Sequence, residues 1–395
     1  MRILFLTPFL PAPDAHHGGG IYLSALAAAL ARQAEIGLCA LLHPEEELSL
    51  QHHPAPWSWH GSAPLPQRPL RAGRRRHQLR MLWRWRRMPL GAAKHWQPEL
   101  VPLLQRALRE FRPDVVCVEM AQMAQYLPFL RQVPTVLTDH EAGCPANTTT
   151  GLGRWGDARD RRLWRRFVHR FYPLATHVQA VTSEDAAALS ALLHRPVGSR
   201  GPAFAVPDRP VAPGAAPPRA LFLGDYRHGP NPEAARVLAR QVLPRLRARH
   251  AQAELWLAGP NQDPALADLR DVPGLRLVGF APDLAALFAQ VRVMLAPLFS
   301  GGGFRVKSLA ALAHGLPVVT NALGARGCTA APPARVVVEG ADALAAAALE
   351  LLESPQAARA AGEAAYAWAR ANLADQAVAN QQLQMLRTLL AAPTR

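Results

Sequence analysis

Residues 300–315 read SGGGFRVKSLAALAHG and carry the clearest local signal in the chain. A strand-like apolar run at 291–298 precedes this stretch, and a second one at 316–320 follows it. Glycines let backbone N–H groups approach a ligand closely, and the N-terminus of a following helix favours anions. Arg305 and Lys307 add charge of the sign that binds a diphosphate. The stretch predicts a phosphate-binding strand–loop–helix, while a tight turn with exposed cations stays open as the simpler interpretation.

Strand-like and helical segments alternate on both sides of this stretch. The glycine triplet at 18–20 precedes a helix expected at 21–32, and residues 43–71 are expected to form a loop. Ser183 is the expected N-cap of a helix at 186–193. This alternation predicts two Rossmann-like, doubly wound parallel α/β sheets that face a central cleft, where ligands bind at the carboxyl ends of the strands. The expected strands are 2–8, 35–42, 114–119, 135–140, 177–182, 219–223, 254–258, 275–278, 292–296, 317–320 and 335–338.

The length of 395 residues exceeds what one hydrophobic core usually serves, so two domains are expected. A proline-rich stretch at 206–218 has the composition of a linker. We predict a first domain at 1–205 on the acceptor side and a second at 219–372 that binds the nucleotide. A helix at 373–395 is predicted to pack back towards the first domain.

The cysteines indicate a reducing environment. The four of them, Cys39, Cys117, Cys144 and Cys328, have neither C-x-x-C nor metal-binding spacing. The start of the chain reads as a strand rather than a secretory signal, because Pro8 interrupts a short apolar run. No stretch approaches the roughly 20 apolar residues that span a bilayer. We therefore expect a cytoplasmic protein.

The net charge of +15 is concentrated in one segment. Between Glu47 and Glu99 there is no acidic residue, and ten lysines and arginines occur there. Residues 74–88 can form a basic, tryptophan-bearing helix of the kind that lies in a membrane interface. Segment Arg71–Arg87 therefore predicts peripheral contact with the inner face of the membrane. A solvated helix face stays open as the alternative, and nucleic-acid binding is disfavoured because no matching motif accompanies the charge.

Two kinds of chemistry fit the sequence poorly. A dinucleotide fold requires G-x-G-x-x-G directly after the first strand, but Gly18–Gly20 lies behind a loop with two prolines. Metal-assisted sugar transfer would need paired carboxylates, and no D-x-D occurs in the chain. His16 and His17 lack a third ligand nearby in the sequence. We expect no metal and no cofactor.

Several stretches in chain order carry a family resemblance. They are ILFLTPFLPAPDAHHGGG from residue 3, TVLTDHE from 135, HVQAVTSEDAAAL from 177, FLGDYRHGPNPEAARVL from 222, and 283–327, which is the most specific. Over nearly its whole length the sequence resembles the GT-B glycosyltransferases of the family-4 type. The resemblance implies transfer of a hexose from a nucleotide-sugar donor with retention and without a metal. It implies a glycan or lipid-linked acceptor, and a role in making cell-envelope polysaccharide.

The resemblance also implies roles for individual residues. His140 would lie beside the transferred sugar, with a core or capping histidine as the alternative, and Lys307 would bind the diphosphate. His140, Lys307 and Arg227 are the predicted catalytic residues. The predicted donor-binding residues are Gly19, Gly20, Gly279, Phe280, Gly302, Gly303, Phe304, Arg305 and Lys307.

The sequence departs from the family pattern at two places. The glutamate pair of the family, spaced E-x7-E, falls on Gly302 and Ala310, and loss of the second glutamate removes about 1–3 kcal/mol of donor binding. Asp225 and Pro230 occupy the usual arginine and lysine positions of the second domain, and Arg227 is the expected substitute. A catalytically degenerate relative that binds a nucleotide sugar or a partner therefore stays open as the alternative function.

Overall fold

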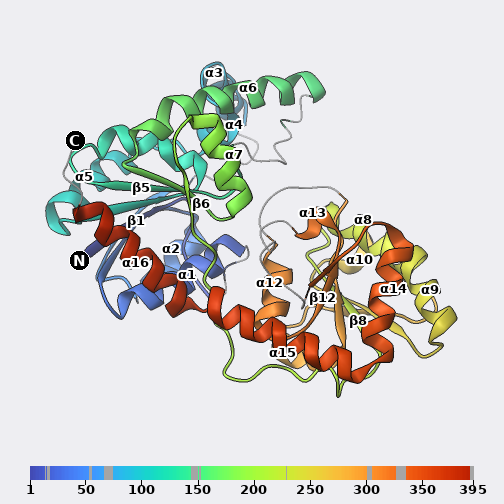
Figure 1. The fold of residues 1–395 in the computed structure, drawn as a ribbon. Coiled ribbons are helices and arrows are strands. Elements are labelled where there is room, and N and C mark those ends of the chain that lie inside the picture. Colours follow the sequence, from blue (N-terminus) through green and yellow to red (C-terminus); the bar gives the residue numbers. More distant parts are fainter. Residues whose placement is uncertain are drawn as a thin grey trace. The chain divides into compact units, whose positions relative to one another are not determined.

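The computed structural model describes the chain except residues 14, 16–17, 53–55, 66–73, 144–149, 151–152, 228, 300–304, 326–334 and 392–395. The chain divides into two compact units (Figure 1). The first consists of Met1–Ala203 and Val378–Arg395, and the second of Phe204–Gly301 and Arg305–Ala377. None of the described helices is both long enough and apolar enough to cross a membrane.

The first unit is built on a seven-stranded sheet in which all strands are parallel. The strand order is β3-β2-β1-β4-β5-β6-β7, so the direction of winding reverses between β1 and β4. Ligands bind such sheets at this point of reversal, beyond the carboxyl ends of the strands. The strands are β1 Arg2–Thr7, β2 Glu35–Leu42, β3 Trp59–Pro64, β4 Val115–Glu119, β5 Thr135–Asp139, β6 His177–Ala180 and β7 Gly198–Ser199.

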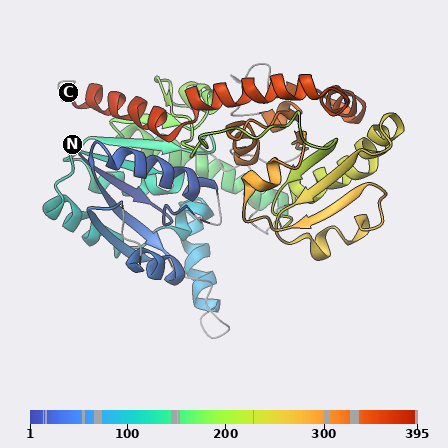
Figure 2. The same cartoon turned by 90° about the horizontal axis from the view of Figure 1, so that it is seen from below.

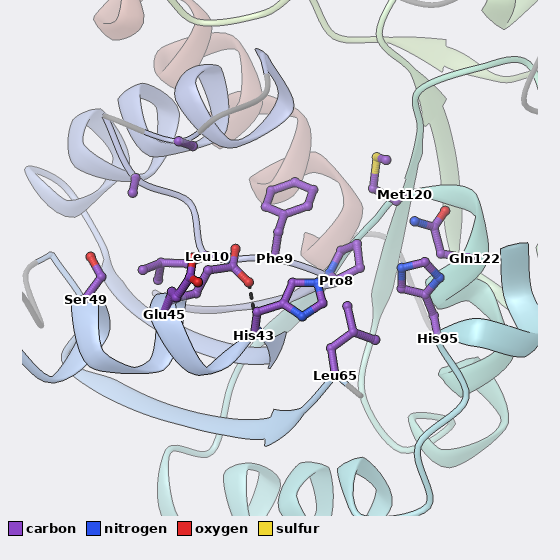
Figure 3. Close-up of a pocket in the computed structure, with 13 residues that line it drawn as sticks. Pro8, Phe9, Leu10, His43, Glu45, Ser49, Leu65, His95, Met120 and Gln122 are labelled. Carbon is purple, nitrogen blue, oxygen red and sulfur yellow. Dashed lines mark hydrogen bonds between the residues drawn. The ribbon is translucent and has the colours of Figure 1, made fainter. Parts of the chain in front are cut away.

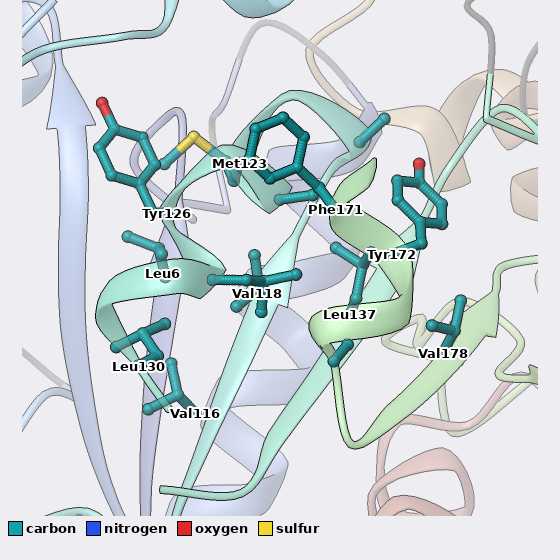
Figure 4. Close-up of a cluster of buried hydrophobic side chains, with 14 of the residues drawn as sticks. Leu6, Val116, Val118, Met123, Tyr126, Leu130, Leu137, Phe171, Tyr172 and Val178 are labelled. Carbon is teal, nitrogen blue, oxygen red and sulfur yellow. The ribbon is translucent and has the colours of Figure 1, made fainter. Parts of the chain in front are cut away.

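Both faces of this sheet are buried. Alternate residues of β1 point to opposite faces, so that Leu4 and Leu6 belong to one apolar cluster (Figure 4) and Ile3 and Phe5 to another. Helices cover each face, which explains why β1 reads as a continuous apolar run. The helices of this unit are α1 Gly18–Ala31, α2 Pro44–His52, α3 Arg74–Trp85, α4 Leu90–Lys94, α5 Leu100–Glu110, η1 Ala121–Phe129, α6 Gly153–Phe171, η2 Tyr172–Leu174, α7 Ser183–Leu193 and, from Val378 onward, α16 Asp375–Ala391.

Three local predictions for the first unit were wrong. Residues 43–71 were expected to form a loop, but they contain α2 and β3. Pro44 begins α2, and the three acidic residues after it suit the positive end of a helix. Helix α1 begins at Gly18, so the glycine triplet forms its first turn rather than preceding it. The N-cap of α7 is Thr182, not Ser183, because the Thr182 hydroxyl accepts a hydrogen bond from the Asp185 N–H.

The second unit has a six-stranded parallel sheet in the order β10-β9-β8-β11-β12-β13, which reverses between β8 and β11. The two sheets confirm the predicted α/β class with two Rossmann-like halves. The strands are β8 Arg219–Leu223, β9 Glu254–Ala258, β10 Leu275–Gly279, β11 Val293–Leu295, β12 Val318–Thr320 and β13 Arg335–Val337. The helices are α8 Pro230–Val237, η3 Leu238–Val242, α9 Leu243–Arg249, α10 Gln262–Ala265, η4 Ala267–Leu269, α11 Leu284–Phe288, α12 Val306–Ala313, α13 Ala322–Ala325, α14 Gly340–Glu353 and α15 Pro355–Asn372.

Candidate active site

His140 directly follows β5, and its imidazole lies in a buried polar cluster of the first unit. Its Nε2 lies 3.0 Å from Oε2 of Glu119, the last residue of the neighbouring strand β4. The hydroxyl of Tyr22, from α1, lies 2.8 Å from each ring nitrogen of His140. The carboxyl ends of two adjacent strands and one helix therefore meet at this histidine.

Glu119 is held ionised by its surroundings. Arg200, directly after β7, donates to it from Nη1 at 3.0 Å and from Nη2 at 3.1 Å, and the Thr138 hydroxyl donates at 3.1 Å. Burial alone raises the pKa of the Glu119 carboxyl. The positive charge of Arg200 and the hydrogen bond from His140 outweigh burial and lower that pKa to about 2. An ionised carboxylate can only accept hydrogen bonds.

For a neutral His140 ring, the contact with Glu119 favours one tautomer. Because Glu119 only accepts, His140 carries its proton on Nε2, which leaves Nδ1 to accept from Tyr22. Burial raises the pKa of the Tyr22 phenol, so its hydroxyl keeps its proton as the donor. Tyr22 lies one turn after the glycines that begin α1, where backbone N–H groups have no partner within the helix itself. Through Tyr22, the turn that contains Gly19 and Gly20 is connected to His140.

A cavity of about 660 Å³ opens at the carboxyl edge of the same sheet (Figure 3). Pro8 and Phe9 follow β1, His43 follows β2, and Met120 follows β4, and all four line the cavity. His95, directly after α4, faces it from the side opposite His43. Histidines in a concave site of this size suit the recognition of a small polar molecule.

In the second unit, Lys307 is the residue that most clearly resembles part of a binding site. It lies in the first turn of α12, and its Nζ donates to Oδ1 of Asn231 at 2.7 Å. The same Nζ lies 4.2 Å from the ring centroid of Phe222, in β8. Burial, and to a smaller extent the charge of Arg305, lowers the pKa of Lys307 to about 7. Lys94 is the only other lysine in the sequence.

Asn231 connects Lys307 to the loop after β8. Its Nδ2 donates to the Asp225 carbonyl at 2.8 Å, and its side chain fills the space beside Gly224. The carboxylate of Asp225 accepts hydrogen bonds from Arg227 and from Asn261, which follows β9. The loops after β8 and β9 therefore form one connected edge at the point where the sheet reverses.

The two predicted arginines differ in their surroundings. Arg305 is buried at the N-cap position of α12, where its Nε donates to the Leu323 carbonyl at 3.2 Å. Arg227 is exposed and forms an ion pair with Asp225 at 2.9 Å, which lowers the pKa of Asp225 chiefly through its hydrogen bond. A ligand phosphate that binds Arg227 has to compete with this carboxylate.

The remaining predicted donor residues lie at or beyond the ends of strands. Gly279 ends β10 with φ of 79°, a conformation that favours glycine, and Phe280 beside it is 71% exposed. Ala310 is buried within α12. Gly302, Gly303 and Phe304 lie outside the described residues. The structure thus brings His140 close to Tyr22 and Glu119, and brings Lys307 close to Asn231, and the assigned roles stay predictions.

Comparison with known structures identifies the class of fold. HepE from Anabaena in complex with UDP superposes with a TM-score of 0.68 at 15% identity, covering 98% of this chain and 100% of that chain. Sucrose-phosphate synthase from Thermosynechococcus elongatus gives 0.70 at 19%, covering 99% and 100%. A glycosyltransferase from Rickettsia africae gives 0.64 at 12%, covering 99% and 98%. The two sheets therefore form the GT-B fold, as predicted.

A family model matches the sequence over part of the second unit. Residues 217–354 match the family described as Glycosyl transferases group 1. This range contains Lys307, Asn231 and the loops after β8 and β9. No curated protein matches the sequence. The predicted resemblance to GT-B glycosyltransferases is confirmed.

Proposed function

We propose that the protein is a retaining, metal-independent glycosyltransferase that moves a hexose from a nucleotide sugar to a glycan or lipid-linked acceptor. The observation that carries the proposal is the partly buried Lys307, whose Nζ has, among the described residues, a neutral amide and an aromatic ring as neighbours. A diphosphate at this edge of the sheet would supply the missing negative charge. The match of residues 217–354 to Glycosyl transferases group 1 supports the same interpretation.

Lys307 would act on the leaving diphosphate. Catalysis of this transfer depends on stabilising the charge that develops as the bond to the sugar breaks. A cation in a site that excludes water is worth more than one in water, because the local dielectric is lower. The buried guanidinium of Arg305 would add to this field, and Arg227 would contribute once its ion pair with Asp225 opens.

His140 would be held rigidly beside the transferred sugar. Its side chain is only 10% exposed, and the hydrogen bonds to Glu119 and Tyr22 fix the plane of the ring. Positioning of this precision contributes to catalysis by limiting the geometries that the reacting groups can adopt. The ionised Glu119 behind the ring would favour the positive charge that develops on the sugar.

A second function stays in view because of Ala310. This residue occupies the predicted position of the second family glutamate, and no carboxylate can act there on the ribose of the donor. A degenerate relative would bind nucleotide without turnover. The test is a screen of UDP-, GDP- and ADP-sugars with the intact protein, in which nucleotide release and nucleotide binding are measured separately.

UDP-glucose is the first donor to test, because HepE has been solved in complex with UDP-glucose. Turnover with any donor supports the enzyme, and binding without turnover supports the degenerate relative. Absence of both from folded protein contradicts the proposal. Turnover in the presence of EDTA tests metal independence, and the anomeric configuration of the product tests retention.

We also propose peripheral contact with anionic lipid through α3, which extends away from the rest of the first unit (Figure 2, light blue). Leu79, Leu82 and Trp83 are exposed on it. Beside them is a second cavity of about 660 Å³, lined by Arg84, Arg86, Arg87 and Arg170 together with aromatic rings.

Flotation with anionic and neutral vesicles tests the membrane contact. The double variant Arg86→Glu, Arg87→Glu, at the two exposed arginines that directly follow α3, should abolish binding to anionic vesicles, while Arg112→Glu, an exposed control after α5, should not. Equal binding by all three proteins would contradict the proposal. The inner face of the membrane stays the predicted location.

A further inference from the structure

The cavity in Figure 3 lies where the winding of the first sheet reverses. From β1 the chain continues to β2 and β3 on one side, while β4 begins the series on the other side. Connections that leave β1 and β4 therefore separate to opposite faces and open a crevice beyond the strand ends. Phe9 and Met120, which follow these two strands, line the cavity. The position of this cavity in the sheet is therefore typical of a ligand-binding site.

The backbone of Met120 is unusual and contributes to the wall. Its φ of 78° and ψ of 139° lie in a region that residues with a Cβ atom avoid. Its N–H nevertheless bonds to the Thr138 carbonyl at 2.9 Å. This turn directs Met120 into the cavity directly after Glu119 has pointed into the buried cluster around Arg200. Strained residues of this kind concentrate at binding sites.

The polar groups of the cavity suit hydroxyls. His95 Nδ1 donates to the Gly91 carbonyl at 2.7 Å, because a carbonyl can only accept. Burial lowers the pKa of His95, so the ring is neutral near pH 7 and its Nε2 is an acceptor. Within the described part of the chain, His43 Nδ1 is buried with no hydrogen-bond partner. The amide of Gln122 lies beside His95 and can donate and accept.

The charged groups of the cavity are negative. Glu46 accepts hydrogen bonds from the backbone N–H groups of Leu10, at 3.0 Å, and His43, at 2.9 Å, and so keeps a carboxylate in the wall. Glu45 lines the cavity next to it, and no lysine or arginine occurs among the described lining residues. A phosphate or carboxylate placed here would be repelled and would find no cation to pair with among the described lining residues.

We propose that this cavity holds an uncharged, hydroxyl-bearing sugar ring, and that this ring is the acceptor of the transfer. Its role as acceptor rests on the proposed function, but its binding does not. A pyranose has a rim of hydroxyls and two C–H faces. The hydroxyls would meet His43, His95 and Gln122, while Phe9, Leu65 and Met120 would cover a face. The second cavity, lined by four arginines, has the opposite chemistry.

The test is direct binding of methyl glycosides of glucose, galactose and mannose to the intact protein, by saturation-transfer NMR and calorimetry. At least one neutral glycoside should bind, and its 6-phosphate should bind at least tenfold more weakly. His95→Ala should lower the affinity for the neutral glycoside at least tenfold. The matched control is His52→Ala, an exposed histidine of α2 that does not line the cavity.

Ala12→Trp, which would fill the cavity from its wall, provides a second variant in case His95→Ala fails to fold. The proposal would be overturned if the phosphates bound as tightly as the neutral glycosides or more tightly, or if the charged methyl glucosaminide bound best. It would also be overturned if neither variant changed the affinity, or if no glycoside bound. Titration of the same preparations with UDP, GDP and ADP separates the two proposals. Glycoside binding without binding of any of these nucleotides contradicts the proposed function alone, and nucleotide binding without glycoside binding contradicts this inference alone.

Discussion

Glu119 in the first unit is buried and Lys307 in the second is partly buried, and both are charged residues near the carboxyl edge of a parallel sheet, but their neighbours differ. Glu119 has a guanidinium, an imidazole and a hydroxyl around it, and its pKa falls to about 2. Among the described residues, Lys307 has an amide and a ring as neighbours, and its pKa falls to about 7. The first environment favours the charged form and the second disfavours it. A charge that neighbouring protein groups neutralise contributes to the stability of the fold. A charge without such neighbours can instead bind the opposite charge of a ligand.

Removing the compensated charge should have the largest effect. Glu119→Gln leaves the buried Arg200 without its partner, so the free energy of unfolding should fall by about 3–5 kcal/mol. Chemical denaturation at pH 7 measures the loss. The double variant Glu119→Met, Arg200→Met should recover most of it, because both charges are then gone. If Glu119→Gln lowered the free energy of unfolding by less than about 1 kcal/mol, the buried ion pair of Glu119 with Arg200 would not be important for stability.

Removing the uncompensated charge should act on the ligand. Lys307→Ala should weaken UDP binding by about 10- to 100-fold, which corresponds to the loss of one charge-assisted contact of roughly 1.5–3 kcal/mol. Lys94→Ala, which removes the only other lysine and is exposed, is the matched control and should bind as the unchanged protein does. Calorimetry measures both affinities. Equal affinities for the two variants would remove Lys307 from the donor site.

The pH dependence of binding should be next in size. The free protein holds Lys307 with a pKa of about 7, and a bound diphosphate would raise that value. Binding therefore takes up a proton above pH 7, so UDP affinity should fall by up to about tenfold per pH unit between pH 7 and 9. Calorimetry in buffers with different ionisation enthalpies measures the uptake. The profile of Lys307→Met should be flat, and the same slope in that variant would assign the proton to another group.

The smallest expected effect is a gain in stability. At pH 7 the unfolded chain protonates Lys307 fully, because its ordinary pKa is 10.5, whereas the folded chain disfavours that proton. Lys307→Met should therefore raise the free energy of unfolding only modestly, because solvent screening of the partly exposed ammonium and the lost bond to Asn231 both reduce the gain. The gain should shrink as pH rises towards 10, because the unfolded lysine then also loses its charge. Thermal unfolding from pH 7 to 10 measures this gain. A gain that stays constant over this range would indicate that packing, rather than the lost charge, causes it.

Much of the fold was predictable because most strands are continuous apolar runs. The predicted limits of β2, β8 and β9 agree with the structure at both ends. β3 was missed because it is an edge strand with only Ala63 fully buried, so its sequence carries little hydrophobic pattern. The glycines of α1 were read as a turn, although a helix can begin with glycine when tertiary packing holds it.

The candidate site was predictable only for residues that lie in a recognisable sequence motif. Lys307 and His140 were predicted, whereas Tyr22, Glu119, Arg200 and Asn231 were not. His140 lies 21 residues from Glu119 and 118 residues from Tyr22 along the chain. Only the parallel pairing of β4 with β5 brings Glu119 next to His140. A charged residue that ends an apolar strand, as Glu119 does, was the one signal that could have pointed to the cluster.

The scarcity of lysine has a practical consequence. With forty-four basic residues of which only two are lysines, isotope labelling of lysine alone would yield a spectrum with two side-chain ammonium signals. Lys94 is exposed and serves as an internal reference, and the signal of Lys307 reports whether a ligand contacts its ammonium group. Fractionated cell extract could then be added until the second signal moves. The natural donor could be isolated in this way without guessing its base or its sugar.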